Sequence, residues 1–147
     1  MNIASLESVL KVLKGGDPKP GANEALFKET LLMTLARASD SDSQIQPVEV
    51  ETVRNLVKAI IGAEVSAAEV RIAAGSEIYE KTPLDKVLAR VSGKLTPEQR
   101  ATIVQALAKV IKSDTDVTQR ELEYFNKMAA ALRTTFAEAA GLIGPGY

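Results

Sequence analysis

The chain has 147 residues with 18 basic and 19 acidic side chains, which gives a formal net charge of −1. It contains no Cys, His or Trp, so disulfide scaffolds, zinc fingers, iron–sulfur clusters, thiol catalysis and Ser-His-Asp triads are excluded. A pI near 5.6 disfavours a nucleic-acid-binding domain, and no apolar run approaches the ~20 residues of a membrane-spanning helix. These features predict a single cytoplasmic domain over residues 1–147.

Signals for the starts and ends of helices recur along the whole chain. Ser or Thr followed three residues later by a polar acceptor marks helix starts at Ser66, Thr82, Thr96 and Thr118, and Thr82 and Thr96 each precede Pro. Glycines mark helix ends, and no β-hairpin pattern is present. The sequence therefore predicts an all-α fold of about seven helices, over residues 3–14, 23–38, 47–61, 67–80, 83–91, 97–112 and 119–140.

An internal repeat lies within this helical pattern. A shift of 72 positions overlays residues 30–57 on residues 102–129 without a gap. The overlay matches two amphipathic helices and also the acidic segment between them. Two amphipathic helices can match by chance, but a match that includes the segment between them is less likely to do so. We therefore predict two equivalent helical hairpins related by a pseudo-two-fold axis, inside a core of residues 23–140, with residues 1–14 forming a separate N-terminal helix.

Each copy of the repeat contains the pattern D-x-x-[IV]-x-x-x-E in the elbow between its two helices. The aliphatic residues, Ile45 and Val117, are predicted to plug the turn into the core. Asp follows one helix and Glu lies in the first turn of the next, so their carboxylates can converge. Carboxylates without His or Cys suit Ca²⁺, Mg²⁺ or Mn²⁺. The candidate metal ligands are Asp42, Glu49, Asp114 and Glu121, flanked by Asp40, Glu51, Asp116 and Glu123.

A purely structural interpretation of these acids stays open. Glu49 and Glu121 at the third helical position satisfy free backbone amides, and Asp42 and Asp114 are typical turn residues. An EF-hand is excluded, because a loop that opens at Asp40 has Ile rather than Gly at its sixth position.

At this point the sequence resembles the TerB-like family of tellurite-resistance proteins. The family signature is an alanine-rich helix that runs into A-D-G-x-[IV]-x-x-x-E, and residues 36–49 and 108–121 carry it, with Ser43 and Thr115 in place of Gly. The resemblance implies an all-helical fold with two pseudo-symmetric hairpins. It also implies a small cytosolic protein of stress and metal-resistance systems, which binds divalent cations through these acids and works with membrane-associated partners.

Our leading hypothesis is a non-enzymatic protein that binds a divalent cation through the acidic elbows. The alternative is a protein–protein interaction module in which the acids only cap helices. An enzyme is the least supported class, because the chain supplies no recognisable pair of nucleophile and base. A membrane-surface role of the N-terminal helix has little support, since only Lys11 and Lys14 supply positive charge there. The sequence leaves the oligomeric state open, a homo-oligomer included.

Overall fold

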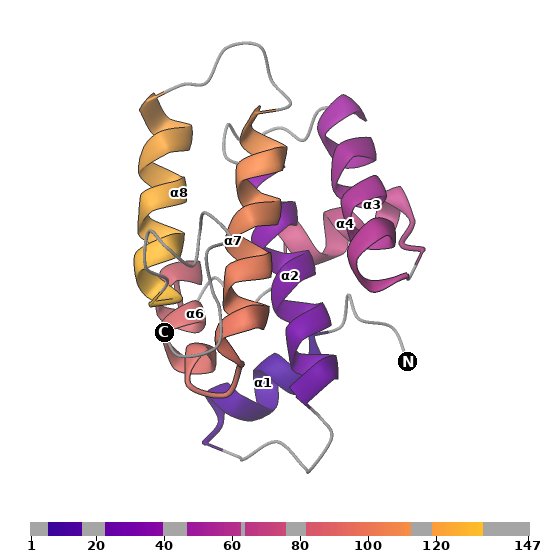
Figure 1. Cartoon of the computed structure of the whole chain (residues 1–147). Coiled ribbons are helices and arrows are strands. Elements are labelled where there is room, and N and C mark those ends of the chain that lie inside the picture. Colours follow the sequence, from indigo (N-terminus) through magenta and orange to yellow (C-terminus); the bar gives the residue numbers. More distant parts are fainter. Residues whose placement is uncertain are drawn as a thin grey trace.

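The computed structural model describes residues 6–15, 23–39, 47–62, 64–75, 82–112 and 119–133. Within these ranges every regular element is a helix, which confirms the predicted all-α fold of about seven helices. None of these described helices is long and apolar enough to cross a membrane. In chain order they are α1 (Glu7–Leu13), α2 (Asn23–Ser39), α3 (Pro47–Ile61), α4 (Ala67–Ala74), α6 (Leu84–Ser92), α7 (Pro97–Lys112) and α8 (Gln119–Ala131) (Figure 1).

Helix α2 lies at the centre of the bundle. Every residue from Glu29 to Ala36 is buried, so this stretch of α2 has no solvent-facing side. It packs against α1, α3, α4, α7 and α8, and all seven described helices contribute to one cluster of buried residues. The core is therefore built around α2.

The two long helices α2 and α7 lie side by side and run in the same direction (Figure 1). Helix α3 runs back along α2, and α8 runs back along α7, so each pair forms an antiparallel hairpin with direct packing between its helices. Two antiparallel hairpins therefore lie in the two segments that the repeat matches, while their equivalence stays a prediction.

Detailed equivalence is clearer between α2 and α7 than between α3 and α8. The hydroxyl of Thr30 donates to the Leu26 carbonyl at 2.7 Å, and 72 residues later the hydroxyl of Thr102 donates to the Glu98 carbonyl at 2.8 Å. By contrast, Val50 is 2% exposed, whereas its counterpart Leu122 is 46% exposed. The pseudo-two-fold relation between whole hairpins stays a prediction.

Two predicted helix boundaries are wrong, each because a residue adopts a left-handed backbone conformation, and a third lies outside the described residues. The first helix begins at Glu7 rather than at residue 3, since Leu6 has φ = 55° and lies in the left-handed region. Of the predicted helix 67–80, α4 covers Ala67–Ala74 and its last turn includes the bond from the Gly75 amide to the Arg71 carbonyl, while residues 76–80 lie outside the described residues. The predicted helix 119–140 ends at Ala131, because the left-handed Arg133 (φ = 55°) interrupts it.

Two of the predicted capping boxes are confirmed. The Ser66 hydroxyl accepts from the Glu69 amide while the Glu69 carboxylate accepts from the Ser66 amide, and Thr96 and Gln99 exchange the same two bonds. The predicted cap at Thr82 is wrong. Pro83, with ψ = 151°, is itself the residue that precedes the first helical turn, and it supplies no side-chain bond. The prediction at Thr118 lies outside the described residues.

Helix α1 receives its N-terminal cap from another helix. Leu6 precedes α1 and offers no side-chain acceptor, but Oε1 of Glu29 on α2 accepts from the backbone amides of Ser8 at 2.8 Å and Val9 at 3.2 Å. Glu29 is only 2% exposed. Burial raises the pKa of the Glu29 carboxyl above its ordinary value, and the hydrogen bonds from Ser8 and Val9 act in the opposite direction.

Two substitutions of Glu29 should distinguish the effect of its hydrogen bonds on stability from the effect of its charge. We expect Glu29→Ala to lower the free energy of unfolding by about 2 kcal/mol, because it leaves two amides without their acceptor. Glu29→Gln keeps a carbonyl oxygen for both amides and should cost much less. Denaturant unfolding at neutral pH measures both variants, and equal losses would contradict the role of Glu29 as a cap.

The raised pKa also sets a pH dependence. A carboxyl whose folded-state pKa lies above its unfolded value of about 4.3 makes the fold less stable as pH rises from that value through the folded pKa. Glu29→Gln cannot ionise, so its stability relative to wild type should increase across this interval and then level off. Denaturant unfolding at a series of pH values between about 4 and 7 checks this. A constant difference between the two proteins would show that the Glu29 pKa is not raised.

Candidate cation site at the helix elbows

The two predicted elbows connect the helices of the two hairpins, one between α2 and α3 and the other between α7 and α8. Because α2 and α7 run in the same direction, the last turns of both lie at the same end of the bundle as the first turns of α3 and α8 (Figure 1). We call this the elbow end. The sequence did not decide between elbows at one end and elbows at opposite ends.

Four of the eight candidate ligands, and both predicted plugs, lie in segments outside the described residues. Of Glu49 the structure describes the backbone, in the first turn of α3, where the sequence predicts it. The burial of Ile45 and Val117 therefore stays a prediction. The candidate ligands outside the described residues are Asp40, Asp42, Asp114 and Asp116.

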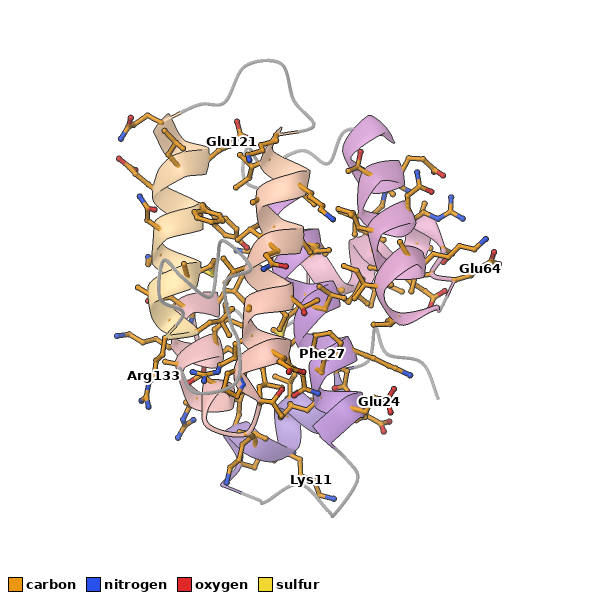
Figure 2. The ribbon with its side chains drawn as sticks, viewed as in Figure 1. Lys11, Glu24, Phe27, Glu64, Glu121 and Arg133 are labelled. Carbon is orange, nitrogen blue, oxygen red and sulfur yellow. The ribbon has the colours of Figure 1, made fainter. Side chains whose placement is uncertain are left out.

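Three candidate ligands have described side chains, and they differ in their surroundings. Glu121 lies in the first turn of α8, at the elbow end, and is half-buried (Figure 2). Glu123 and Glu51 are exposed. Among the side chains that the structure describes, no three acids come close enough together to hold a metal ion.

Glu51 is already paired with a cation of its own helix. Arg54 Nη1 donates to Glu51 Oε2 at 2.9 Å, while Arg54 Nε donates to the Val65 carbonyl at 2.7 Å. The second bond fixes the guanidinium between α3 and the segment that leads into α4. Glu51 is therefore the weakest of the proposed ligands, because Arg54 compensates its charge.

Glu51 and Arg54 also line a shallow hollow of about 170 Å³ on the surface of α3, together with Asn55, Lys58, Glu64 and Val65. Lys58 Nζ lies 2.8 Å from Glu64 Oε1, and this hydrogen bond and the Lys58 charge lower the pKa of Glu64. The four charges of the hollow form two pairs, so it has no unmatched charge to attract an ion. No sequence pattern indicates this hollow, because its residues come from two segments.

In the sequence, the Glu and the Asp residues of the elbows lie next to opposite ends of helix dipoles. The first turns of α3 and α8 carry a positive partial charge, which favours Glu49 and Glu121 by about 0.3–1 kcal/mol each. The last turns of α2 and α7 carry a negative partial charge, and Asp40, Asp42 and Asp114 follow these turns within three residues in the sequence. Capping therefore explains the two Glu residues and leaves the Asp residues unexplained.

Two substitutions test whether the bond of Arg54 to Glu51 or its bond to the Val65 carbonyl contributes more to the stability of the fold. Glu51→Gln should change the free energy of unfolding by less than about 1 kcal/mol, because the pair is exposed and screened by solvent. Arg54→Ala should cost more, about 2 kcal/mol, because it also leaves the Val65 carbonyl without its charged donor. Denaturant unfolding of the two variants decides, and the reverse order would contradict the anchoring role of Arg54.

One protein-family model matches the part of the chain that contains both elbows. The family model described as Tellurite resistance protein TerB matches residues 28–142, which confirms the resemblance seen in the sequence. The matched range contains both elbows with all eight candidate acids, and it leaves out α1. No significant match was found among curated proteins or among solved structures.

Proposed function

The chain belongs to the TerB family of tellurite resistance proteins, and on that premise we propose that it binds a divalent cation through its acidic elbows, without catalysing a reaction. The cation is Ca²⁺, Mg²⁺ or Mn²⁺, since the candidate ligands are all carboxylates. The ligands with the strongest support are Asp42, Glu49, Asp114 and Glu121, with Asp40, Asp116 and Glu123 beside them. Glu51 contributes less, because Arg54 pairs with it.

The observation that carries this proposal is the common end of the two elbows. Ca²⁺ takes roughly six to eight oxygen ligands, more than one elbow supplies from its carboxylates. Elbows at the same end of the bundle allow a shared site. Backbone carbonyls and water commonly supply the remaining oxygen ligands of such a coordination shell.

Electrostatics supports the same proposal. Four Asp residues lie in the two short segments that follow the C-terminal ends of parallel helices, where the helix dipoles disfavour negative charge. A bound divalent cation would compensate both the dipoles and the repulsion among the carboxylates. A turn-forming role alone would be served equally well by Asn.

The wider role follows from the family. We propose a cytoplasmic, single-domain protein of a stress or metal-resistance response, whose partner is a membrane-associated protein. Tellurite itself is not the proposed ligand, because the chain has no Cys for its reduction and the elbows carry the same sign of charge as an oxyanion.

The alternative of a protein–protein interaction module has one structural observation in its favour. Ile72 on α4 and Leu122 on α8 are large apolar side chains that are 56% and 46% exposed. In that case the elbow acids are helix caps, and added cations leave the protein unaffected.

Thermal unfolding distinguishes the two proposals. The protein should unfold at a higher temperature in millimolar Ca²⁺, Mg²⁺ or Mn²⁺ than in EDTA, and a cation at 100 times its Kd should add about 2.7 kcal/mol to the free energy of unfolding. If none of the three cations shifts the transition, the interaction module replaces the cation-binding proposal.

A double variant tests the location of the site. Asp42→Asn with Asp114→Asn should raise stability in EDTA, by relieving repulsion, and should abolish the stabilisation by cations. Asp85→Asn with Glu98→Gln is the matched control, since it removes two acids from the first turns of α6 and α7 and should keep the cation response. A cation response that survives in the Asp42 and Asp114 variant would place the site elsewhere.

A further inference from the structure

Helices α1 and α6 are distant in the sequence but in direct contact in the fold. They pack against each other, and Arg90 Nη1 on α6 donates to the carbonyl of Leu13, the last residue of α1, at 3.2 Å. The bond places Arg90 beside Lys14, which follows Leu13 in the chain. The fold thus adds cations from α6 to those of α1.

Four exposed cations lie on these two contacting helices or directly after α1. Lys11 and Lys14 are three residues apart on and after α1, and Lys86 and Arg90 are four residues apart on α6, so each pair lies on one side of its segment. We call these four residues the α1–α6 basic cluster. Glu7 and Asp85 are the acids in the first turns of the same helices, and the buried carboxyl of Glu29 also contacts the first turn of α1, so the exposed acids of α1 and α6 are fewer than the exposed cations.

The α1–α6 basic cluster lies at the end of the bundle opposite the elbow end, where Figure 2 shows Lys11. Helix α7, which runs between the two ends, has 16 residues and is therefore about 24 Å long. This length is about three Debye lengths at physiological ionic strength. Salt therefore screens the cluster from the elbow acids, and the net charge of −1 does not describe the local potential.

The chemistry of the cluster favours an anionic lipid surface over nucleic acid. Three of the four cations are lysines, which act as mobile point charges and suit fluid headgroups better than the fixed phosphates of a duplex. The cluster contains no aromatic side chain on which a base could stack. The apolar residues Val9 and Val12 of α1 are buried against the bundle, so the contact would be electrostatic and peripheral, without insertion of α1.

We propose that the α1–α6 basic cluster docks this protein peripherally on membranes that contain anionic phospholipids. The elbow end then faces away from the membrane, into the aqueous phase. Docking is independent of cation binding at the elbows, and two of its lysines lie outside the range that the family model matches.

Flotation with lipid vesicles tests the proposal. The wild-type chain, in EDTA and at low salt, should float with vesicles that contain phosphatidylserine and should stay behind with vesicles of phosphatidylcholine alone. Lys11→Gln/Lys14→Gln/Lys86→Gln should weaken the partition onto anionic vesicles by about 100-fold, since each lysine near such a surface contributes about 1 kcal/mol. Raised salt should weaken the wild-type partition as well.

A matched control separates the cluster from net charge. Lys109→Gln/Lys112→Gln/Lys127→Gln removes the same charge from exposed positions on α7 and α8, and it should leave the partition nearly unchanged. Thermal unfolding of both triple variants should match wild type, because all six side chains are exposed. An equal loss in the control variant would overturn the proposal.

Two further results would overturn it. One is equal flotation of wild type with neutral and anionic vesicles. The other is tighter binding of wild type to a DNA or RNA oligonucleotide than to anionic vesicles, with loss in the Lys11, Lys14 and Lys86 variant, which would make nucleic acid the ligand of the cluster. EDTA in every sample keeps these outcomes separate from cation binding at the elbows.

Discussion

The burial of α2 on all sides constrains the rest of the structure. Eight consecutive residues, Glu29 to Ala36, are removed from water, and three of them carry polar side chains whose groups need partners inside the protein. The hydroxyls of Thr30 and Thr34 donate to carbonyls four residues earlier in α2, and Glu29 accepts from α1. The Thr34 carbonyl also accepts from the Tyr124 hydroxyl at 3.0 Å, which ties α8 to α2. These bonds fix how α1 and α8 sit on the central helix.

The short helices depend on side chains from elsewhere in the fold to complete their ends. Helices of seven or eight residues are unstable alone, so α1 and α4 need tertiary support. Arg37 Nη1 donates to the Ala74 carbonyl at the end of α4, and Arg90 serves the end of α1 in the same way. Arg100 Nη1 donates to the Leu132 carbonyl beyond α8. An arginine is suited to this role because its charge also complements the negative end of the helix dipole.

Sequence reasoning succeeds here where the determining interactions are local. The capping boxes at Ser66 and Thr96 join residues three positions apart, and both are present in the structure. The cap of α1 is a long-range interaction with Glu29, so no pattern near α1 could indicate it. Its only sign is an acid placed among the apolar residues of α2. Local reasoning fails at Leu6 and Arg133, whose left-handed conformations arise in residue types that seldom adopt them.

The candidate site also combines features that the local sequence determines with features that only the packing of distant helices determines. The repeat indicates two elbows, but whether they share an end depends on the direction of α7 relative to α2, which is a matter of packing between distant segments. In the sequence, Asp residues closely follow the C-terminal ends of α2 and α7, where the helix dipoles disfavour negative charge, a local cost that natural proteins retain mainly at functional sites. The basic cluster needs the fold even more, because its two halves lie more than 70 residues apart.

The two ends of the bundle are joined by α2, which begins beside α1 and ends at the first elbow (Figure 1). Ligands at both ends would each stabilise the folded chain by mass action. Coupling between their affinities would further require that the bundle adopt two conformations with different affinities at both ends. A helix buried along its middle resists such a change, because its packed neighbours leave no room for a second arrangement. The physical expectation is therefore that the elbow end and the basic cluster bind additively, so that a cation alters the stability of a docked protein but not its affinity for the membrane.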